Sequence, residues 1–171
     1  MTVTGTIVGV EDFIFGFAIG GILIAGYEFF LQKELVESDK FSDGWSRTRM
    51  VLTLFLGSFF VTYTVSGFPS WLSWSISSIL GAMLIVYYRR DLLKASLGTG
   101  LIAFTYSIVG YQILLLYNPD FVQQTYLLDQ LSGMLWLGVP IEEYIWFFTS
   151  GLLVGPYYEL YHELELIDKN S

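Results

Sequence analysis

Long apolar segments recur along this chain and are separated by short polar stretches. A helix needs about 20 mostly apolar residues to cross the hydrocarbon core of a bilayer. By that length we identify five segments, at residues 11–30, 50–66, 70–88, 94–117, and from 131 or 140 to about 158. The sequence therefore predicts an all-α fold, a polytopic bundle of transmembrane helices that forms one integral-membrane domain over residues 1–171.

The composition supports a membrane environment and excludes several functions. Hydrophobic residues make up 54% of the chain and charged residues 14%, so a soluble globule would have too little polar surface. The net charge of −8 leaves no basic surface for nucleic acid. Cysteine is absent and His162 is the single histidine, so we expect no metal site and identify no cofactor.

The basic residues predict how the chain is oriented. Lys and Arg stay preferentially on the cytoplasmic side of a membrane. With the five segments above, all eight fall on one side, which places the N-terminus outside and the C-terminus inside a multi-pass protein of the cell membrane. These residues are Lys33, Lys40, Arg47, Arg49, Arg89, Arg90, Lys94 and Lys169.

The region before the last segment leaves the helix count open. Because proline kinks or begins a helix, Pro140 permits residues 131–139 to be a separate half-helix or the start of a kinked fifth helix, giving five or six helices. We expect Pro140 at the first helical position, with Glu142 and Glu143 in the first turn behind it. The polar residues 118–130 are expected to form the main external loop.

Two acid pairs stand at the predicted outer ends of the first and last segments. Glu11-Asp12 and Glu142-Glu143 are each followed by aromatic residues. Carboxylates close to hydrocarbon are rare and indicate a functional site. The alternative is a capping role, because the free N–H groups at the start of a helix also stabilise a negative charge. The recurrence suggests an internal duplication, with half-repeats at about 1–90 and 91–171. Gly16 and Gly20 provide a small-residue step for close helix packing.

The acid pairs and nearby rings suggest acid–base chemistry on a cation. Adjacent helical residues point about 100° apart, so one of Glu142 and Glu143 should face inward while the other bonds water or backbone. Two facing acids would divide into a protonated and an ionised member. Aromatic ring faces attract a carbocation, although the same rings also suit an interfacial belt. The rings that we expect to contact substrate are Phe13, Phe15, Tyr144, Trp146 and Phe147.

These motifs resemble those of a known family. The segment Pro140-Ile141-Glu142-Glu143-Tyr144-Ile145-Trp146 resembles the Pro-x-Glu-(Glu/Asp)-x-x-Phe signature of the integral-membrane lycopene cyclases. The segment Glu11-Asp12-Phe13-Ile14-Phe15-Gly16-Phe17 is similar to the other Glu-Asp headpiece of that family. Val10 stands where the family often has proline, and Trp146 stands where Phe is usual. The resemblance in sequence motifs covers the two end segments, and the middle of the chain resembles the family only in its hydropathy pattern.

The resemblance implies an intramolecular lyase or isomerase that closes a ring on lycopene without net redox. Glu142, Glu143, Glu11 and Asp12 carry over as catalytic candidates, and a linear carotenoid or other polyprenyl compound as the lipid-soluble substrate. Three alternatives stay open: a related hydratase, a prenyltransferase-like enzyme, and a non-catalytic subunit that binds lipid or carotenoid. The protein is expected to act alone or in a homo- or hetero-oligomer. Prenyl transfer ranks low among these alternatives.

Overall fold

Helices dominate the computed structural model, which describes residues 44–126 and 131–162, residues 21 and 128, and the backbone of 33–37 and 164–168. Five α-helices lie in these ranges: α2 (Gly44–Phe60), α3 (Ser70–Tyr88), α4 (Leu93–Tyr117), α5 (Phe121–Thr125) and α6 (Ile141–Tyr161). The predicted helix at 11–30, with Gly16 and Gly20, lies outside the described residues, apart from Gly21, which is helical.

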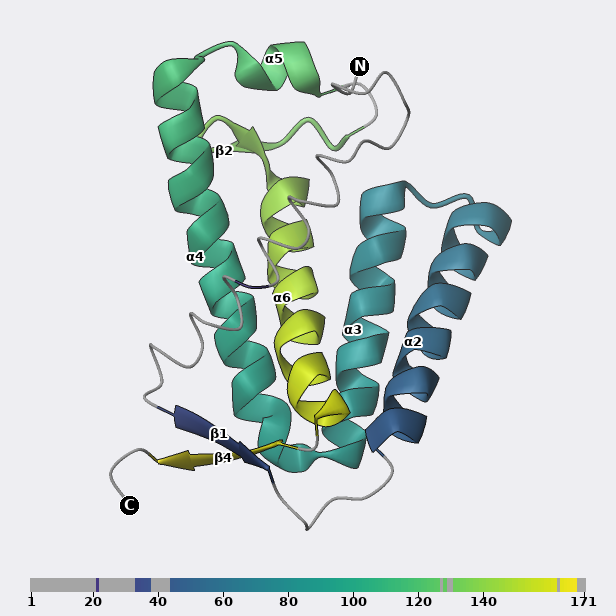
Figure 1. Cartoon of the computed structure of the whole chain (residues 1–171). Helices are drawn as coiled ribbons and strands as arrows, with labels where there is room; N and C mark the ends of the chain where they lie inside the picture. Colours follow the sequence, from purple (N-terminus) through teal and green to yellow (C-terminus); the bar gives the residue numbers. More distant parts are fainter. Residues whose placement is uncertain are drawn as a thin grey trace, which may run out of the picture.

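The last long helix, α6, is the centre of the bundle. It lies between α4 and α3, and α2 packs on the far side of α3 (Figure 1). One buried cluster, formed by Val51, Ile85, Leu92, Ala95 and Leu160, joins α2, α3, α4 and the end of α6. A second cluster at the start of α6 brings together Val122, Val139 and Tyr144.

Among the residues that the structure describes, three helical stretches are long and apolar enough to cross a membrane: Gly44–Val65, Ser70–Tyr88 and Arg90–Tyr117. They indicate an integral membrane protein. The 21-residue α6 is not one of them, although the sequence predicts a fifth span there. It carries Glu142, Glu143 and Glu159, and nearly half of its residues are buried in the bundle. A central helix meets its neighbours more than lipid, so it needs less apolar surface.

The hydropathy pattern predicts where the apolar helices lie more accurately than it predicts the residues at which they begin and end. The predicted 70–88 matches α3, and α4 begins at Leu93, one residue before the predicted start. By contrast, α2 begins at Gly44 instead of residue 50 and continues as a π-helix, Val61–Val65. The polar residues before 50 extend the helix, and the Thr48 hydroxyl donates to the Gly44 carbonyl at 2.7 Å. The predicted loop 118–130 contains the short α5.

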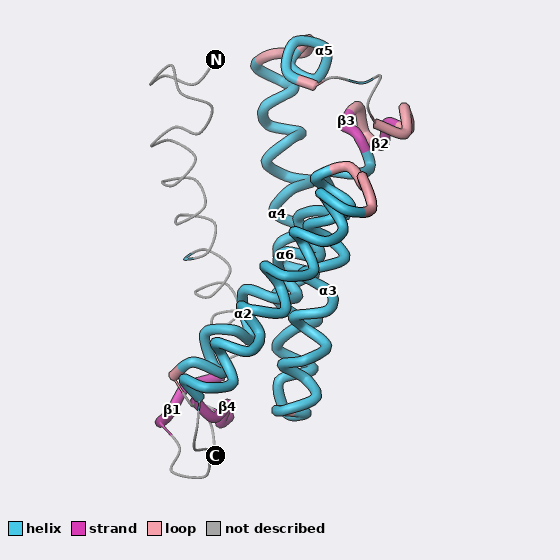
Figure 2. Tube along the Cα trace, turned by 90° about the vertical axis from the view of Figure 1, so that its right-hand side faces the viewer, coloured by secondary structure: helices cyan, strands magenta, loops and turns pink. Residues whose placement is uncertain are grey.

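Two pairs of short strands, which the sequence did not predict, accompany the mostly helical fold. Strand β1 (Lys33–Glu37) pairs antiparallel with β4 (Leu164–Asp168), and β2 (Leu135–Trp136) pairs antiparallel with β3 (Val139–Pro140). The two pairs lie at opposite ends of the helices (Figure 2). Strands of two to five residues are too short for a hydropathy window, and β1 and β4 are distant in the sequence, so neither pair could be read from local pattern.

The β2–β3 hairpin settles what precedes α6. Residues 131–139 are neither a half-helix nor part of a kinked helix: Leu137 and Gly138 have φ of 51° and 81°, as a two-residue type I′ turn requires. The Gln112 amide of α4 donates to the Leu137 carbonyl at 2.9 Å and holds this turn. Pro140 immediately precedes the helix instead of occupying its first position, whereas Glu142 and Glu143 lie in the first turn as predicted.

The second half of α6 packs on α4 through glycine. A Cβ on Gly151 would lie 2.6 Å from the Thr99 carbonyl oxygen and 2.8 Å from the Ala103 Cβ, and a Cβ on Gly155 would overlap the Thr99 side chain. The Thr99 hydroxyl also donates to the Gly151 carbonyl at 2.7 Å. Two glycines four residues apart thus let two backbones meet, which is the packing that the sequence suggested for Gly16 and Gly20.

Pro156 interrupts the hydrogen bonding of α6 at this contact. It has no N–H, so the carbonyl of Leu152, four residues earlier, loses its helical donor. The Ser96 hydroxyl of α4 donates to that carbonyl at 2.7 Å. A side chain of the neighbouring helix therefore supplies the hydrogen bond that proline removes, as membrane helices require.

Candidate active site

The first turn of α6 directs its two carboxylates to different neighbours. Glu142 is buried, and its Oε1 accepts a hydrogen bond from the Ser132 backbone N–H at 2.6 Å. Its Oε2 is buried and has no hydrogen-bond partner within the described ranges. The half-buried Glu143 faces α4, where its Oε2 accepts from the Tyr111 hydroxyl at 2.5 Å. One carboxylate thus bonds backbone while the other faces a neighbouring helix, as the helical spacing predicts.

Two tyrosines form a hydrogen-bonded series that ends on Glu143. The hydroxyls of Tyr111 and Tyr126 are 2.9 Å apart. A phenol has one proton, so Tyr111, which donates to Glu143, must accept from Tyr126. Burial raises the pKa of Tyr126 to about 12, so its hydroxyl keeps the proton that this direction needs at neutral pH. The series fixes Tyr111 as a donor toward the carboxylate.

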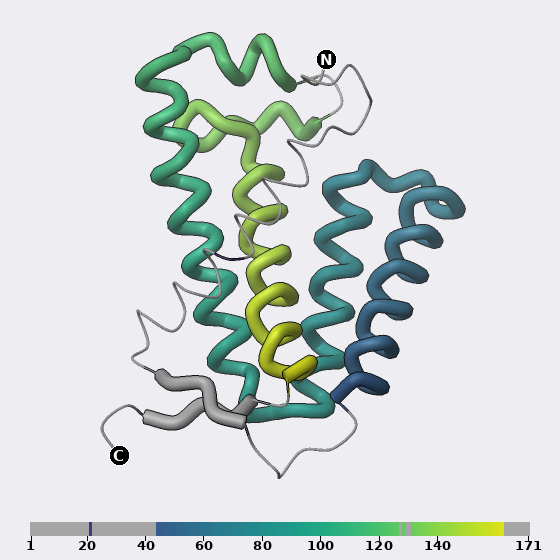
Figure 3. Tube along the Cα trace, in the orientation of Figure 1, coloured from purple at the N-terminus to yellow at the C-terminus, as the bar shows by residue number. Residues whose placement is uncertain are grey.

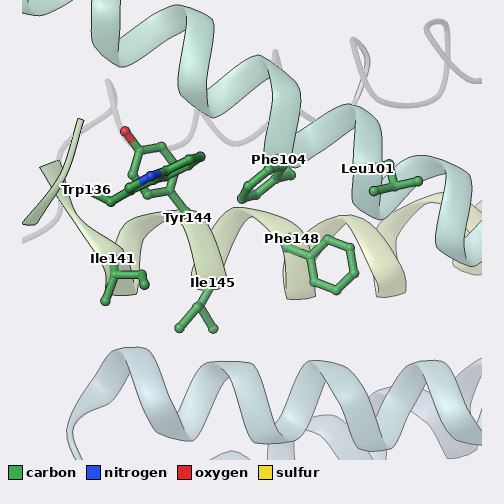
Figure 4. Close-up of a pocket in the computed structure, with 7 residues that line it drawn as sticks. All are labelled: Leu101, Phe104, Trp136, Ile141, Tyr144, Ile145 and Phe148. Carbon is green, nitrogen blue, oxygen red and sulfur yellow. The ribbon is translucent and has the colours of Figure 1, made fainter. Parts of the chain in front are cut away.

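A first cavity, which we call the tryptophan cavity, lies between α4 and α6 (Figure 4). Its volume is about 470 Å³, within the usual range of ligand sites. The rings of Trp136 and Tyr144 meet edge to face with centroids 5.0 Å apart, and Phe104 stacks on Trp136 at 5.9 Å. The lining is apolar and consists of Leu101, Phe104, Trp136, Ile141, Tyr144, Ile145 and Phe148.

A second cavity, the tyrosine cavity, has a volume of about 320 Å³. Tyr111 and Phe147 are both part of its wall and meet edge to face with centroids 6.1 Å apart. The ring of Tyr144 contacts both Tyr111 and Phe104, so it stands between the two cavities. Glu143 is joined to the tyrosine cavity through Tyr111. The full lining is Tyr106, Ser107, Gly110, Tyr111, Leu114, Phe121 and Phe147.

The predicted substrate-binding residues of α6 are distributed around the helix. Tyr144 lines the tryptophan cavity and Phe147 the tyrosine cavity. Trp146 lines neither of them and packs against Trp74 of α3, with centroids 5.8 Å apart. The remaining predicted site residues, Glu11, Asp12, Phe13 and Phe15, lie outside the described residues. Within the described ranges, no three His, Asp or Glu side chains group closely enough to hold a metal ion.

Sequence reasoning missed Tyr111 and Tyr126, which hold Glu143. Tyr111 is followed by Gln112, the one amide side chain of the long apolar helix α4, and a tyrosine beside an amide at that place is the signal that could have found it. Both residues bond to the region around α6: Tyr111 to Glu143, and Gln112 to the hairpin turn. Tyr126 follows α5 in a polar segment, where the sequence carries no comparable signal.

Comparison with known proteins places this chain in a family. The family model described as lycopene cyclase matches residues 69–161, more than half of the chain. The match includes Glu142, Glu143, both tyrosines of the series and the linings of both cavities. Neither a curated protein nor a solved structure gives a significant match. On the family match, together with the helical spans and the Pro-x-Glu-Glu motif at the head of α6, the chain belongs to the lycopene cyclase family.

Proposed function

We propose that this protein is a carotenoid cyclase that closes a six-membered ring at the end of a linear carotene such as lycopene. The observation that carries the proposal is the contact between Glu143 and Tyr111, which sets a carboxylate beside an aromatic cavity within the region that matches the family. The apolar linings suit a long hydrocarbon, and a polyene dissolved in the bilayer can reach them from the lipid.

The reaction is an acid-catalysed isomerisation. A carboxylic acid protonates the terminal double bond of the polyene and leaves a tertiary cation. The π electrons of a neighbouring double bond attack that cation and form the ring bond, which moves the positive charge into the ring. A carboxylate then removes a proton from an adjacent carbon, so the product has the same formula as the substrate and no redox partner is needed.

Glu143 is our leading candidate for proton transfer, and Glu142 the second. Tyr111 holds Glu143 toward the tyrosine cavity, whereas Glu142 bonds the loop at Ser132. The rings of Tyr111, Tyr144 and Phe147 lie close to this position, and their faces can stabilise a cation as it forms. Glu11 and Asp12 remain the second proposed acid pair, with Phe13 and Phe15 beside them.

The proposed orientation places the acid site toward the outside of the membrane. Glu142 and Glu143 lie at the start of α6. Arg89 and Arg90 lie between α3 and α4, and Lys94 lies in the first turn of α4, at the other end of the bundle. Basic residues favour the cytoplasmic side. The repeated acid pair followed by aromatic residues supports half-repeats at about 1–90 and 91–171.

The test is expression of the full chain in a host that accumulates lycopene, followed by chromatography of the pigments. We expect cyclised carotene to appear, and membrane fractionation verifies that the protein is inserted. Unchanged lycopene in cells with well-inserted protein would contradict the proposal. Lycopene that copurifies with the protein without turnover would instead favour a carotenoid-binding subunit.

A further inference from the structure

We propose that the groove between α3 and α4 binds an anionic phospholipid, with the phosphate on Arg90 and one apolar chain in the groove. This site lies apart from the carboxylates of α6 and does not depend on the cyclase reaction. The proposal follows from three features: the shape of the groove, the cations at its end, and the level at which those cations stand in the membrane.

The groove has a volume of about 490 Å³ and is walled by helices on three sides. Residues of α3 form one wall, residues of α4 the other, and Leu152 of α6 reaches it from the central helix. Met83 and Tyr87, which are 63% and 76% exposed, belong to the α3 wall, so the groove is open to the surroundings of the bundle. The lining is apolar apart from Tyr87, Ser96 and Arg90.

The chain passes from α3 to α4 at one end of the bundle (Figure 3). Three basic residues lie there in the sequence: Arg89, Arg90 and Lys94. Arg89 is engaged by Asp91, with Nη2 and Oδ2 2.6 Å apart. Arg90 lines the groove and is exposed, and Lys94, one turn further on, is exposed as well. Within the described residues no carboxylate pairs with Arg90 or Lys94. The planar guanidinium offers a phosphate two parallel hydrogen bonds, and the ammonium adds a second charge.

The position of Arg90 identifies the ligand as a membrane lipid. Arg90 is the first residue of the candidate span Arg90–Tyr117 and follows the end of the span Ser70–Tyr88 by two residues, so it lies at the level of the headgroups. The groove runs from there along both helices into the hydrocarbon. A molecule that satisfies both parts has an anion at one end and an apolar chain at the other. A carotene has no anion for Arg90, whereas anionic lipids are enriched in the cytoplasmic leaflet, where the basic residues are expected.

The test measures which lipid the full-length protein retains. The protein is extracted into mild detergent with equal amounts of phosphatidylglycerol and phosphatidylcholine, and bound lipid is counted by native mass spectrometry. We expect phosphatidylglycerol to be preferred, and Arg90→Gln to reduce that preference roughly fivefold. Adding Lys94→Gln should reduce it further. Equal retention of both lipids by the unaltered protein, or no change in Arg90→Gln, would overturn the proposal.

Two further variants separate this site from general surface charge. Arg47→Gln removes the same charge near the same end, but the Arg47 guanidinium lies over the Tyr88 ring, 5.7 Å from its centroid, and outside the groove. We expect it to keep the preference, and an equal loss there would mean unspecific attraction. Leu97→Trp fills the groove and leaves every charge in place, so bound phosphatidylglycerol should fall. If that variant sheds copurified carotenoid and keeps phosphatidylglycerol, the groove is a polyene site and the proposal fails.

Discussion

From Ile141 to Phe148 the side chains of α6 are mostly large, aromatic or acidic, whereas from Thr149 to Pro156 they are mostly small or aliphatic. The first half borders two cavities with Tyr144 and Phe147. The second half meets α4 so closely that Gly151 and Gly155 leave no room for a Cβ. One helix thus combines two kinds of contact: its second half packs closely on α4, and its first half places acidic and aromatic side chains beside the two cavities.

The largest effect should come from the carboxylates of the first half. We expect Glu143→Gln to lower the conversion of lycopene by roughly 100-fold or more, because the amide cannot exchange the proton, and Glu142→Gln to lower it strongly as well. The matched control is Glu159→Gln, a buried carboxyl in the last turn of the same helix. Product is measured by chromatography at equal levels of inserted protein. Equal activity in the three variants would remove the distinction between the halves.

The glycine contact should matter for stability more than for chemistry. Gly155→Ala places a methyl group against the Thr99 side chain, and we expect a loss of about 1–3 kcal/mol in the free energy of unfolding. Gly57→Ala on α2 is the control, since a Cβ there meets nothing within 4 Å. That change should be neutral or slightly stabilising, because alanine favours helix. Thermal unfolding in detergent compares the two, and matched transitions would show that α6 does not depend on close packing.

Tyr111 should act as a positioning residue for Glu143. Tyr111→Phe keeps the ring and removes the hydroxyl, so we expect activity to fall roughly tenfold through loss of one hydrogen bond to a charged group. The loss should appear in kcat more than in KM, because the aromatic wall is retained. Tyr106→Phe, a change at another tyrosine of the same cavity, is the control. A fall of activity in both variants, or a rise in KM with kcat unchanged, would mean that Tyr111 acts through substrate packing.

The smallest effect should come from the hydrogen bond that replaces the one lost at Pro156 in the second half of α6. Ser96→Ala removes the donor to the Leu152 carbonyl and should cost about 1 kcal/mol of stability. In a Pro156→Ala background residue 156 regains its N–H and can serve that carbonyl, so Ser96→Ala should cost less there. Unfolding of the two single variants and the double variant gives the coupling. Strictly additive losses would show that Ser96 does not compensate for Pro156.

The sequence predicted helix bounds correctly where a proline or charged residues mark the ends of the apolar run. Proline at position 69 and the basic pair at 89 and 90 frame α3, and its predicted bounds match those observed. The start of α2 was wrong, because the helix continues through polar residues that lie outside the apolar run. The hairpin before α6 was missed because it depends on the positive φ of Leu137, a conformation that leucine rarely adopts and that no sequence pattern signals.

The candidate site could be predicted in part from the sequence. The pair Glu142-Glu143 stands out because carboxylates are unusual beside an apolar run. Which neighbour each one meets depends on the packing of α4 on α6: Tyr111 is 32 residues from Glu143, and Ser132 is 10 residues from Glu142. The close glycine contact was likewise beyond the sequence, since the small-residue step at Gly151 and Gly155 gains its meaning only from Thr99 opposite.

The most direct test of acid-catalysed ring closure is the mass of the product formed in heavy water. Membranes that contain the protein are equilibrated with D₂O, supplied with lycopene, and the cyclised carotene is analysed by mass spectrometry. A carboxyl group exchanges its proton with solvent, so protonation of the polyene should add one deuterium for each ring formed, and Glu143→Gln should give almost no product. A cyclised product without deuterium, or a mass change that shows loss or gain of two hydrogens, would contradict this account.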